Sequence, residues 1–267
     1  CTSKNLTLTP RQRIVAYRRL AQLSDNESNR KTREKWAKEM AYGFNETCAT
    51  DGLCAIACPV NIDTGALVKE LRWKENGRWA NSIASSIANN MKEVTSIIRG
   101  VMKTPHAIAK TIGYHNMESI TKGLYKVGNG LLPLWTRYTP SSSKKIVRDI
   151  FPAESADSPM AVYFPSCITR SMGGASYGYR ETDDVPAKML SLLRKANYTV
   201  IIPEEKDKLC CGMAFSSKGF RKQARQKETE LNEALLKASR NGELPILCDM
   251  SPCLLHMRET LDPRLKL

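Results

Sequence analysis

The sequence predicts an α+β protein, with a helical first half followed by an α/β half that contains a small parallel sheet. Two observations lead to this prediction. Up to about residue 135, apolar residues recur at the helical period, and Gly or Pro separates one amphipathic segment from the next. After residue 160, short apolar runs alternate with amphipathic helical segments, which is the order that produces parallel strands.

The first half is expected to contain helices only. Thr9-Pro10 favours a helix start, because Pro is well tolerated at the first helical position. Thr64 and Gly77 mark the two ends of a later helix. The predicted helices span residues 10–23, 31–42, 64–77 and 79–101, followed by shorter pieces over 104–135 that are broken at Pro105, Gly113, Gly123 and Gly128-Asn129-Gly130.

The second half is expected to form a strand–helix–strand–helix–strand unit. A Pro- and Ser-rich stretch precedes it and is predicted to be a linker. We therefore expect domains over 1–138 and 160–267, joined by the linker 139–159. The predicted strands span 160–164, 198–202 and 245–249, and the predicted helices span 184–196 and 220–240.

Positive charge is concentrated in the first part of the chain. Residues 1–150 contain 24 of the 41 Lys and Arg and 12 of the 27 Asp and Glu. Such a surface suits an acidic redox partner or anionic lipid, although a solvated helical surface would look the same. The basic residues are not interleaved with aromatic ones, so we do not expect nucleic acid as a partner. No apolar run approaches 18 residues, so no membrane-spanning helix is predicted.

The stretch CATDGLCAIACPV, at 48–60, nearly matches the bacterial cluster-binding pattern C-x2-C-x2-C-x3-C-P. Cys48, Cys54 and Cys58 occupy the first, third and fourth cysteine positions, and Pro59 follows. Asp51 occupies the second position. A carboxylate oxygen can replace a thiolate on one iron, but Asp51-Gly52 is also an ordinary turn pair. Both interpretations of Asp51 stay open.

The cysteines of the second half follow the predicted strands. Cys167 comes after the first strand, Cys210-Cys211-Gly212 after the second and Cys253 after the third. Because the carboxyl ends of parallel strands meet at one edge, these side chains should meet there. Thiolates in such a place suit Zn²⁺ or an iron–sulfur cluster. Cys248, inside the third strand, is expected to be a packed core residue.

The pattern PSC…CCG…SPC resembles the cysteine-rich CCG domain of heterodisulfide reductase subunits and of the glycolate oxidase iron–sulfur subunit. LCCGMAFSSKGF and ILCDMSPCLLHMRE are similar, more specifically, to FAD/iron–sulfur D-lactate dehydrogenases. CTSKNLTLTPRQRIVAYRRL and CATDGLCAIACPVNIDTG are similar to the ferredoxin-type segment of the same proteins. The stretch 79–138 adds little to this resemblance.

The resemblance implies a helical ferredoxin-type iron–sulfur domain over 1–138 and one truncated CCG repeat over 160–267. It also implies a central fragment of a longer protein whose flavin-binding domain lies upstream. Cys1 would be the last cysteine of a preceding ferredoxin motif, and Cys58 would serve a second cluster whose other ligands are upstream. The usual C-x-x-C ending would need a cysteine at Met250. The implied metal ligands are Cys1, Cys48, Asp51, Cys54, Cys58, Cys167, Cys210, Cys211 and Cys253.

The function implied is electron relay in a FAD- and iron–sulfur-dependent D-2-hydroxy-acid dehydrogenase, acting on D-lactate or glycolate. FAD on the missing domain would take the hydride, and clusters, expected to be [4Fe-4S], would pass electrons to a quinone or cytochrome. The flavin-binding domain, on the same chain or on a partner subunit, and the acceptor are the expected partners. A cytoplasmic location with a peripheral membrane contact is expected.

Two alternatives stay open. One is a non-enzymatic zinc- or cluster-binding module, and the other is a thiol redox subunit like that of heterodisulfide reductase. No catalytic residue is assigned, because the three histidines are dispersed along the chain.

Overall fold

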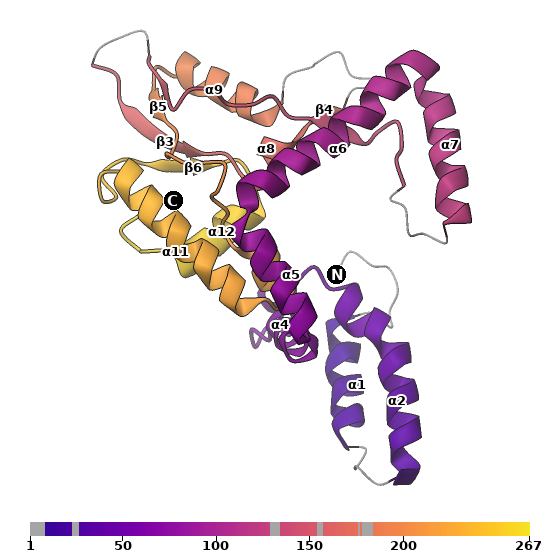
Figure 1. Ribbon diagram of the computed structural model, residues 1–267. Coiled ribbons are helices and arrows are strands. Elements are labelled where there is room, and N and C mark those ends of the chain that lie inside the picture. The colour runs from indigo at the N-terminus through magenta and orange to yellow at the C-terminus, as the bar shows by residue number, and fades with distance from the viewer. Residues whose placement is uncertain (1–8, 23–26, 129–133, 154–156, 176, 178–183) are drawn as a thin grey trace. The chain divides into compact units, whose positions relative to one another are not determined.

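Figure 1 shows the computed structural model, which describes residues 9–22, 27–128, 134–153, 157–175, 177 and 184–267. The chain has the predicted α+β fold. It divides into two compact units. The helical unit contains the described residues up to Ser85 together with Met213–Ala224, and the sheet unit contains Ser86–Gly212 and Arg225–Leu267. The domain limits predicted from the sequence stay a prediction.

The helical unit contains the predicted first helix, α1 (Pro10–Gln22), which begins at the proline. The next helix is longer than predicted at its start and ends in a π-helical turn. The carboxylate of Asp63 accepts the backbone N–H of Gly65 at 2.7 Å and so caps the predicted helix at Thr64. The other elements are α2 (Glu27–Ala41), η2 (Tyr42–Glu46), α3 (Leu53–Ile56), α4 (Thr64–Glu75) and α10 (Met213–Ser217).

The prediction of one helix over 79–101 was wrong, because two helices occupy this stretch. They are α5 (Arg78–Asn89) and α6 (Met91–Ile112), and Asn90 between them leaves the helical conformation at φ −117° and ψ 38°. The side-chain amide of Asn90 donates to the carbonyl of Ser86 at 2.8 Å. Asn is a weak helix former that competes for backbone groups in this way, which accounts for the break.

The predicted break at Pro105 does not occur, since α6 continues through it to Ile112. The next helix, α7 (Tyr114–Val127), likewise continues through Gly123. His106 and Ala109 of α6 are buried, so packing on that face compensates for the hydrogen bond that proline removes. The predicted break at Gly113 is confirmed.

All three predicted strands are confirmed. The central strand β3 (Met160–Phe164) pairs in parallel with β5 (Thr199–Ile201) and with β6 (Ile246–Cys248). A short strand that the sequence did not predict adds to the edge beside β5, antiparallel to it. The buried cluster Tyr163, Leu193, Val200 and Ile202 joins the sheet to α9. The elements of this sheet and its helices are β2 (Ile150–Phe151), β3 (Met160–Phe164), α8 (Cys167–Ser171), α9 (Val185–Lys195), β5 (Thr199–Ile201), α11 (Arg221–Ala238), β6 (Ile246–Cys248) and α12 (Ser251–Thr260).

The stretch predicted to be a linker, 139–159, contributes strands to the sheet unit. β1 (Pro140–Ser142) pairs with β4 (Met172–Ala175), and β2 pairs with β5. Strands of two or three residues carry no periodic pattern, and the Pro and Ser of this stretch are typical of loops. The linker prediction is corrected to this extent.

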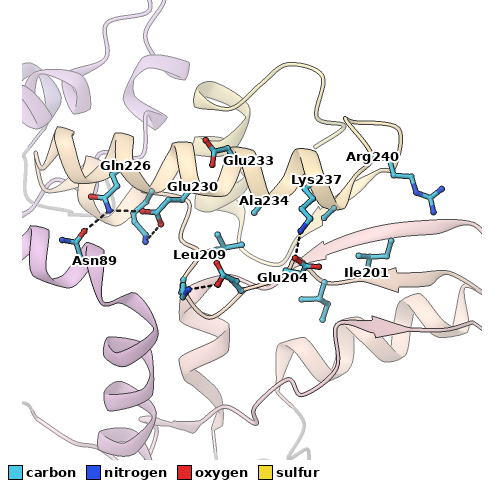
Figure 2. A pocket seen from close by; sticks show the side chains of 15 residues that line it. Asn89, Ile201, Glu204, Leu209, Gln226, Glu230, Glu233, Ala234, Lys237 and Arg240 are labelled. Carbon is cyan, nitrogen blue, oxygen red and sulfur yellow. Dashed lines mark hydrogen bonds and ion pairs between the residues drawn. The ribbon is translucent and has the colours of Figure 1, made fainter.

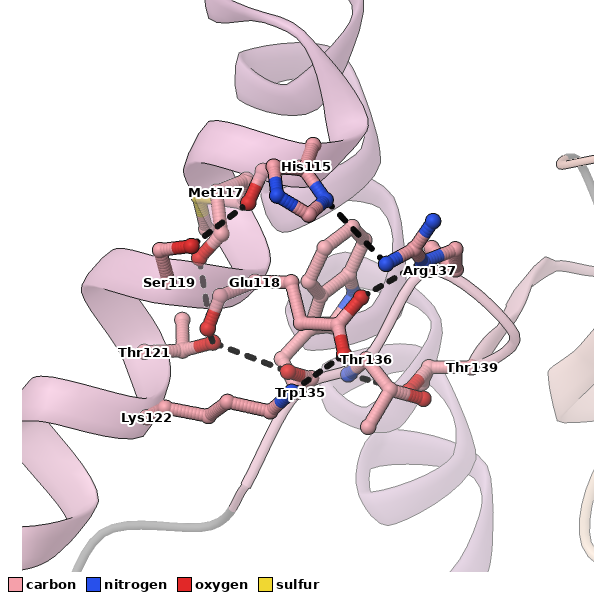
Figure 3. Close-up of polar contacts among 10 residues, drawn as sticks. All are labelled: His115, Met117, Glu118, Ser119, Thr121, Lys122, Trp135, Thr136, Arg137 and Thr139. Carbon is pink, nitrogen blue, oxygen red and sulfur yellow. Dashed lines mark hydrogen bonds and ion pairs between the residues drawn. The ribbon is translucent and has the colours of Figure 1, made fainter.

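A polar network joins α7 to the segment just before β1 (Figure 3). The carboxylate of Glu118 accepts from Lys122 and from Arg137, each at 2.7 Å. Thr121 donates to the carbonyl of Trp135 at 2.8 Å. These contacts fix α7 to a segment that carries no helix of its own.

Among the described residues, no helix combines the length and hydrophobicity that crossing a membrane requires.

Candidate metal centre

The thiols of the second half meet at the carboxyl edge of the sheet. β3 lies between β5 and β6, so the segments that follow these three strands leave the sheet at neighbouring positions. Cys167 is the first residue of α8, directly after β3, and its helix is capped by the Ser166 hydroxyl. Cys210 and Cys211 end the loop that follows β5, where Gly212 adopts a φ of +88°. That value lies in the left-handed region that favours glycine.

Three of these thiols form a hydrogen-bonded chain. Cys167 donates to Cys210, and Cys210 donates to Cys211. Donation to Cys210, followed by burial, raises the pKa of Cys167 well above its ordinary value. The bond from Cys167 lowers the pKa of Cys210, but donation to Cys211 and burial outweigh it and leave that pKa at about 11. In the metal-free protein Cys167 and Cys210 are therefore held as neutral thiols.

Cys248 and Cys253 have different surroundings. Cys248 ends β6, and burial raises its pKa to about 11. Its thiol donates to the carbonyl of Met250 at 3.7 Å. Cys253 lies in the first turn of α12 and is partly exposed. The structure therefore brings together Cys167, Cys210 and Cys211.

Asp249 fixes the edge on which these cysteines lie. Its carboxylate accepts from the hydroxyl of Tyr163 at 2.6 Å, from the backbone N–H of Ser166 at 3.0 Å and from the hydroxyl of Thr169 at 2.7 Å. Burial and then the charge of Asp249 raise the pKa of Tyr163. One carboxylate thus joins the end of β6 to β3 and to the start of α8, the helix that begins with Cys167.

Arg170, also on α8, reaches the loop before Cys210. Its guanidinium donates to the carbonyls of Lys206 and Leu209, and its side chain is only 3% exposed. Asp207 lies 3.8 Å from it. The backbone that leads into Cys210-Cys211 is therefore held by the helix that carries Cys167.

The cysteine run of the helical unit faces two cavities. Cys48, Asp51 and Cys54 line one of about 60 Å³. Cys54 also lines the second, of about 550 Å³, together with Cys58. The predicted division of the run, in which Cys58 serves a different cluster from Cys48, stays a prediction. Cys1, the other predicted ligand, lies outside the described residues.

The predicted ligands Cys58 and Asp51 of this run differ in the hydrogen bonds that they accept. Backbone N–H groups of Ile62, Val60 and Asn61 point at the sulfur of Cys58 and lower its pKa. The carboxylate of Asp51 accepts the N–H of Leu53 at 3.2 Å, so it caps the turn into α3 while lining the smaller cavity. Cys58 thus has surroundings that stabilise a thiolate.

Two buried arginines hold the backbone around Cys48. Arg72 of α4 donates to the carbonyl of Cys48 at 2.9 Å and also to the carbonyls of Asn45 and Ser217. Arg13 of α1 donates to the carbonyl of Gly43 at 3.1 Å and to the hydroxyl of Thr47. Burial lowers the pKa of Arg72, and the nearby Cys48 counteracts this. The guanidinium stays charged, because arginine is not deprotonated in proteins.

The donor chemistry at the sheet edge suits a metal or an iron–sulfur cluster. The thiols of Cys167, Cys210 and Cys211 are hydrogen-bonded to one another through sulfur. The buried guanidinium of Arg170 lies beside them and can offset thiolate charge. Across the described ranges, however, no three Cys, His, Asp or Glu side chains already stand in the geometry of a closed metal site. A bound metal or cluster would replace the thiol protons and draw the sulfurs into its own geometry.

A separate cavity of about 800 Å³ lies along α11 and the loop that leads from β5 toward Cys210 (Figure 2). Apolar side chains such as Leu209 and Ala234 line it, and the ion pair of Lys237 with Glu204, at 2.6 Å, crosses it. Lys227 is buried there and donates to the carbonyl of Ala88. No described cysteine lines this cavity, so it is distinct from the thiol cluster.

The residues that sequence reasoning missed are those that hold the cysteine segments in place, namely Asp249, Arg170, Arg72 and Arg13. The signal for Asp249 was its place at the carboxyl end of the third strand, between two cysteines. The arginines could not be found from the sequence, because they bind backbone carbonyls, which every residue has whatever its side chain.

Residues 161–258 match the model of a family described as the cysteine-rich domain, CCG. No curated protein and no solved structure gave a match to the chain. The matched range contains the thiol cluster, Arg170, Asp249 and Cys253. Residues 161–258 therefore match a CCG cysteine-rich domain, which is found in iron–sulfur oxidoreductase subunits, and the match suggests a metal-binding or redox module.

Proposed function

We propose that this chain is the electron-transfer part of a flavin- and iron–sulfur-dependent oxidoreductase that oxidises a D-2-hydroxy acid such as D-lactate or glycolate. The observation that carries the proposal is the cluster of Cys167, Cys210 and Cys211 at the carboxyl edge of a parallel sheet, inside a CCG domain. Support for the substrate class comes from the sequence resemblance alone. FAD would bind to another domain or subunit, and a quinone or cytochrome would accept the electrons.

An iron–sulfur cluster supplies one-electron chemistry with little structural change. The described residues have separate tasks around such a group. Cys167, Cys210 and Cys211 would bind it in the sheet unit, and Cys48, Cys54 and Cys58 would bind in the helical unit. Asp249 orients the segment of Cys167, and the amides that follow Cys58 stabilise its thiolate.

The first test is the metal content of the protein purified without oxygen. We expect iron and sulfide, broad visible absorption and an EPR signal after reduction. Replacing Cys211 by Ser should remove the part of the signal that belongs to the CCG centre. Cys248→Ser is the matched control, because it makes the same small substitution at the same edge of the sheet. A colourless protein that holds zinc alone would reject electron relay and favour the alternative of a zinc-binding module.

The second test addresses the substrate. When the protein is isolated together with its flavin-bearing part, D-lactate or glycolate should bleach the visible absorption under anaerobic conditions, whereas L-lactate should not. Absence of bleaching with both hydroxy acids, in a preparation that dithionite does bleach, would remove the substrate assignment and leave the relay standing.

A further inference from the structure

We propose that Arg170 is a positioning residue for the CCG centre, which ties the Cys210 loop to the helix of Cys167 and offsets thiolate charge with its own buried positive charge. The inference rests on the proposed binding of a metal or cluster by these cysteines. It concerns a residue that the pattern PSC…CCG…SPC does not include.

The contacts of Arg170 place it between the two cysteine segments. Its own helix begins at Cys167, and its guanidinium donates to the carbonyls of Lys206 and Leu209 in the loop that ends at Cys210. Leu209 is the residue directly before Cys210. A third bond runs to the carbonyl of Ser166 at 3.3 Å. The planar fork of one side chain therefore fixes the backbone on both sides of the thiol pair Cys167–Cys210.

A lysine cannot make the same set of bonds. The guanidinium offers five N–H donors in a rigid plane, whereas an ammonium is a compact point charge at the end of a flexible chain. At this position a lysine would retain the charge and lose the simultaneous contacts to Lys206 and Leu209. The two parts of the proposal, position and charge, can thus be separated by substitution.

Among the described residues, the buried charge of Arg170 has one ion-pair partner, Asp207. The side chain is 3% exposed, and three of its hydrogen bonds go to neutral carbonyls. Asp207 is 3.8 Å away, beyond hydrogen-bond distance, and its own side chain is 21% exposed. A buried cation is costly unless negative charge is near it. The negative forms of Cys167 and Cys210 also favour the charged guanidinium, whereas Arg99 disfavours it, so thiolates bound to a metal would add to the partial compensation that Asp207 provides.

The test uses Co²⁺ alone as the probe, since thiolate-bound cobalt absorbs visibly and needs no cluster assembly. The whole chain carries Cys48→Ser, Cys54→Ser and Cys58→Ser, so that the other cysteine run does not contribute. In this background we expect thiolate absorption that Cys211→Ser abolishes. Arg170→Met should weaken Co²⁺ binding on the order of tenfold or more, and Arg170→Lys should weaken it less. Arg194→Met, which removes an exposed arginine from α9 of the same unit, should bind as the background does.

Hydrogen exchange of the metal-free protein tests the position separately and checks folding. In Arg170→Lys, amides over 206–211 should exchange faster than in the background, while those of α9 and α11 should not change. Equal Co²⁺ affinity of Arg170→Met and the background would overturn the charge part. Unchanged exchange over 206–211 would overturn the positioning part. If the background itself binds no Co²⁺ through thiolates, the CCG centre fails as a metal site and the inference fails with it.

Discussion

At the scale of single residues, Asp249 determines how the cysteine edge of the sheet is built. Three donors from β3 and α8 end on its carboxylate, and the nearest of them, the Tyr163 hydroxyl, belongs to a fully buried side chain. Charged acceptors form the stronger class of hydrogen bond, and a donor left without its partner in a buried place costs more than the bond itself contributes.

Asp249→Ala is therefore expected to lower the free energy of unfolding by about 2–4 kcal/mol, because it leaves buried donors without an acceptor. Tyr163→Phe removes one donor and leaves the carboxylate with two others, so about 1–2 kcal/mol is expected. Urea unfolding of the metal-free protein measures both. A smaller loss for Asp249→Ala than for Tyr163→Phe would contradict the role given to the carboxylate.

Glu118 carries the clearest pH dependence. Hydrogen bonds from Lys122 and then from Arg137 lower its pKa from 4.5 to about 2 (Figure 3). Because the unfolded chain binds this proton first, the contribution of Glu118 to stability is complete above pH 4.5 and is lost as the pH falls toward 2. Thermal unfolding of Glu118→Gln should therefore show a smaller drop between pH 5 and pH 2.5 than the unchanged protein shows.

The exposed Glu259 provides the control for that measurement. Glu259→Gln should follow the pH dependence of the unchanged protein. If both variants behave alike, the network around Arg137 does not hold Glu118 in its charged form.

At the scale of elements, the turn between α10 and α11 is fitted against α4. Gly219 adopts a φ of +81°, and a Cβ placed there would lie 2.5 Å from the backbone nitrogen of Trp73. Backbone atoms cannot yield as a flexible side chain can, and the left-handed conformation adds strain for any residue with a Cβ.

Gly219→Ala is expected to destabilise the protein by about 2–4 kcal/mol through this clash and strain. Gly100→Ala and Gly123→Ala are the matched controls, because these glycines lie inside α6 and α7 with open space around them. They should raise the stability by about 0.5–1 kcal/mol, since alanine is the better helix former. Chemical unfolding of the three variants measures these changes in the free energy of unfolding. If Gly219→Ala changes it no differently from the two control variants, the turn accommodates the Cβ without strain.

The strands and helices that carry a strong periodic pattern could be predicted from the sequence, as MAVYF at β3 and the segment of α1 show. The break at Asn90 could not, because the choice between one helix and two depends on a side-chain bond to Ser86. β1 and β2 are too short for a pattern and exist through their partners.

The site shows the same division. Their order along the chain predicts that Cys167, Cys210, Cys211 and Cys253 meet at one edge, and the structure brings the first three together. Arg170 could not be predicted in this way. Its contact with Leu209 spans 39 residues and ends on a carbonyl that every residue possesses.

At the scale of the whole molecule, the units do not coincide with continuous halves of the chain. Met213–Ala224 belongs to the helical unit although it follows the CCG turn directly. A fragment ending at residue 138 would therefore lack α10, the carbonyl of Ser217 that Arg72 binds, and Gly219. We expect that fragment to be less stable than the helical unit of the full chain. Hydrogen exchange would report this as weaker protection of the amides in α1 and α4. Equal protection in both would show that 213–224 is dispensable.

The bond of Arg72 to Ser217 also has a consequence for the order of events on the ribosome. The sequence distance is 145 residues, so the backbone around Cys48 lacks one of its anchors until the chain has been synthesised past Ser217. Cys210 and Cys211 have by then already been made. The backbone around Cys48 therefore has its full set of Arg72 contacts only after both cysteine runs have been synthesised.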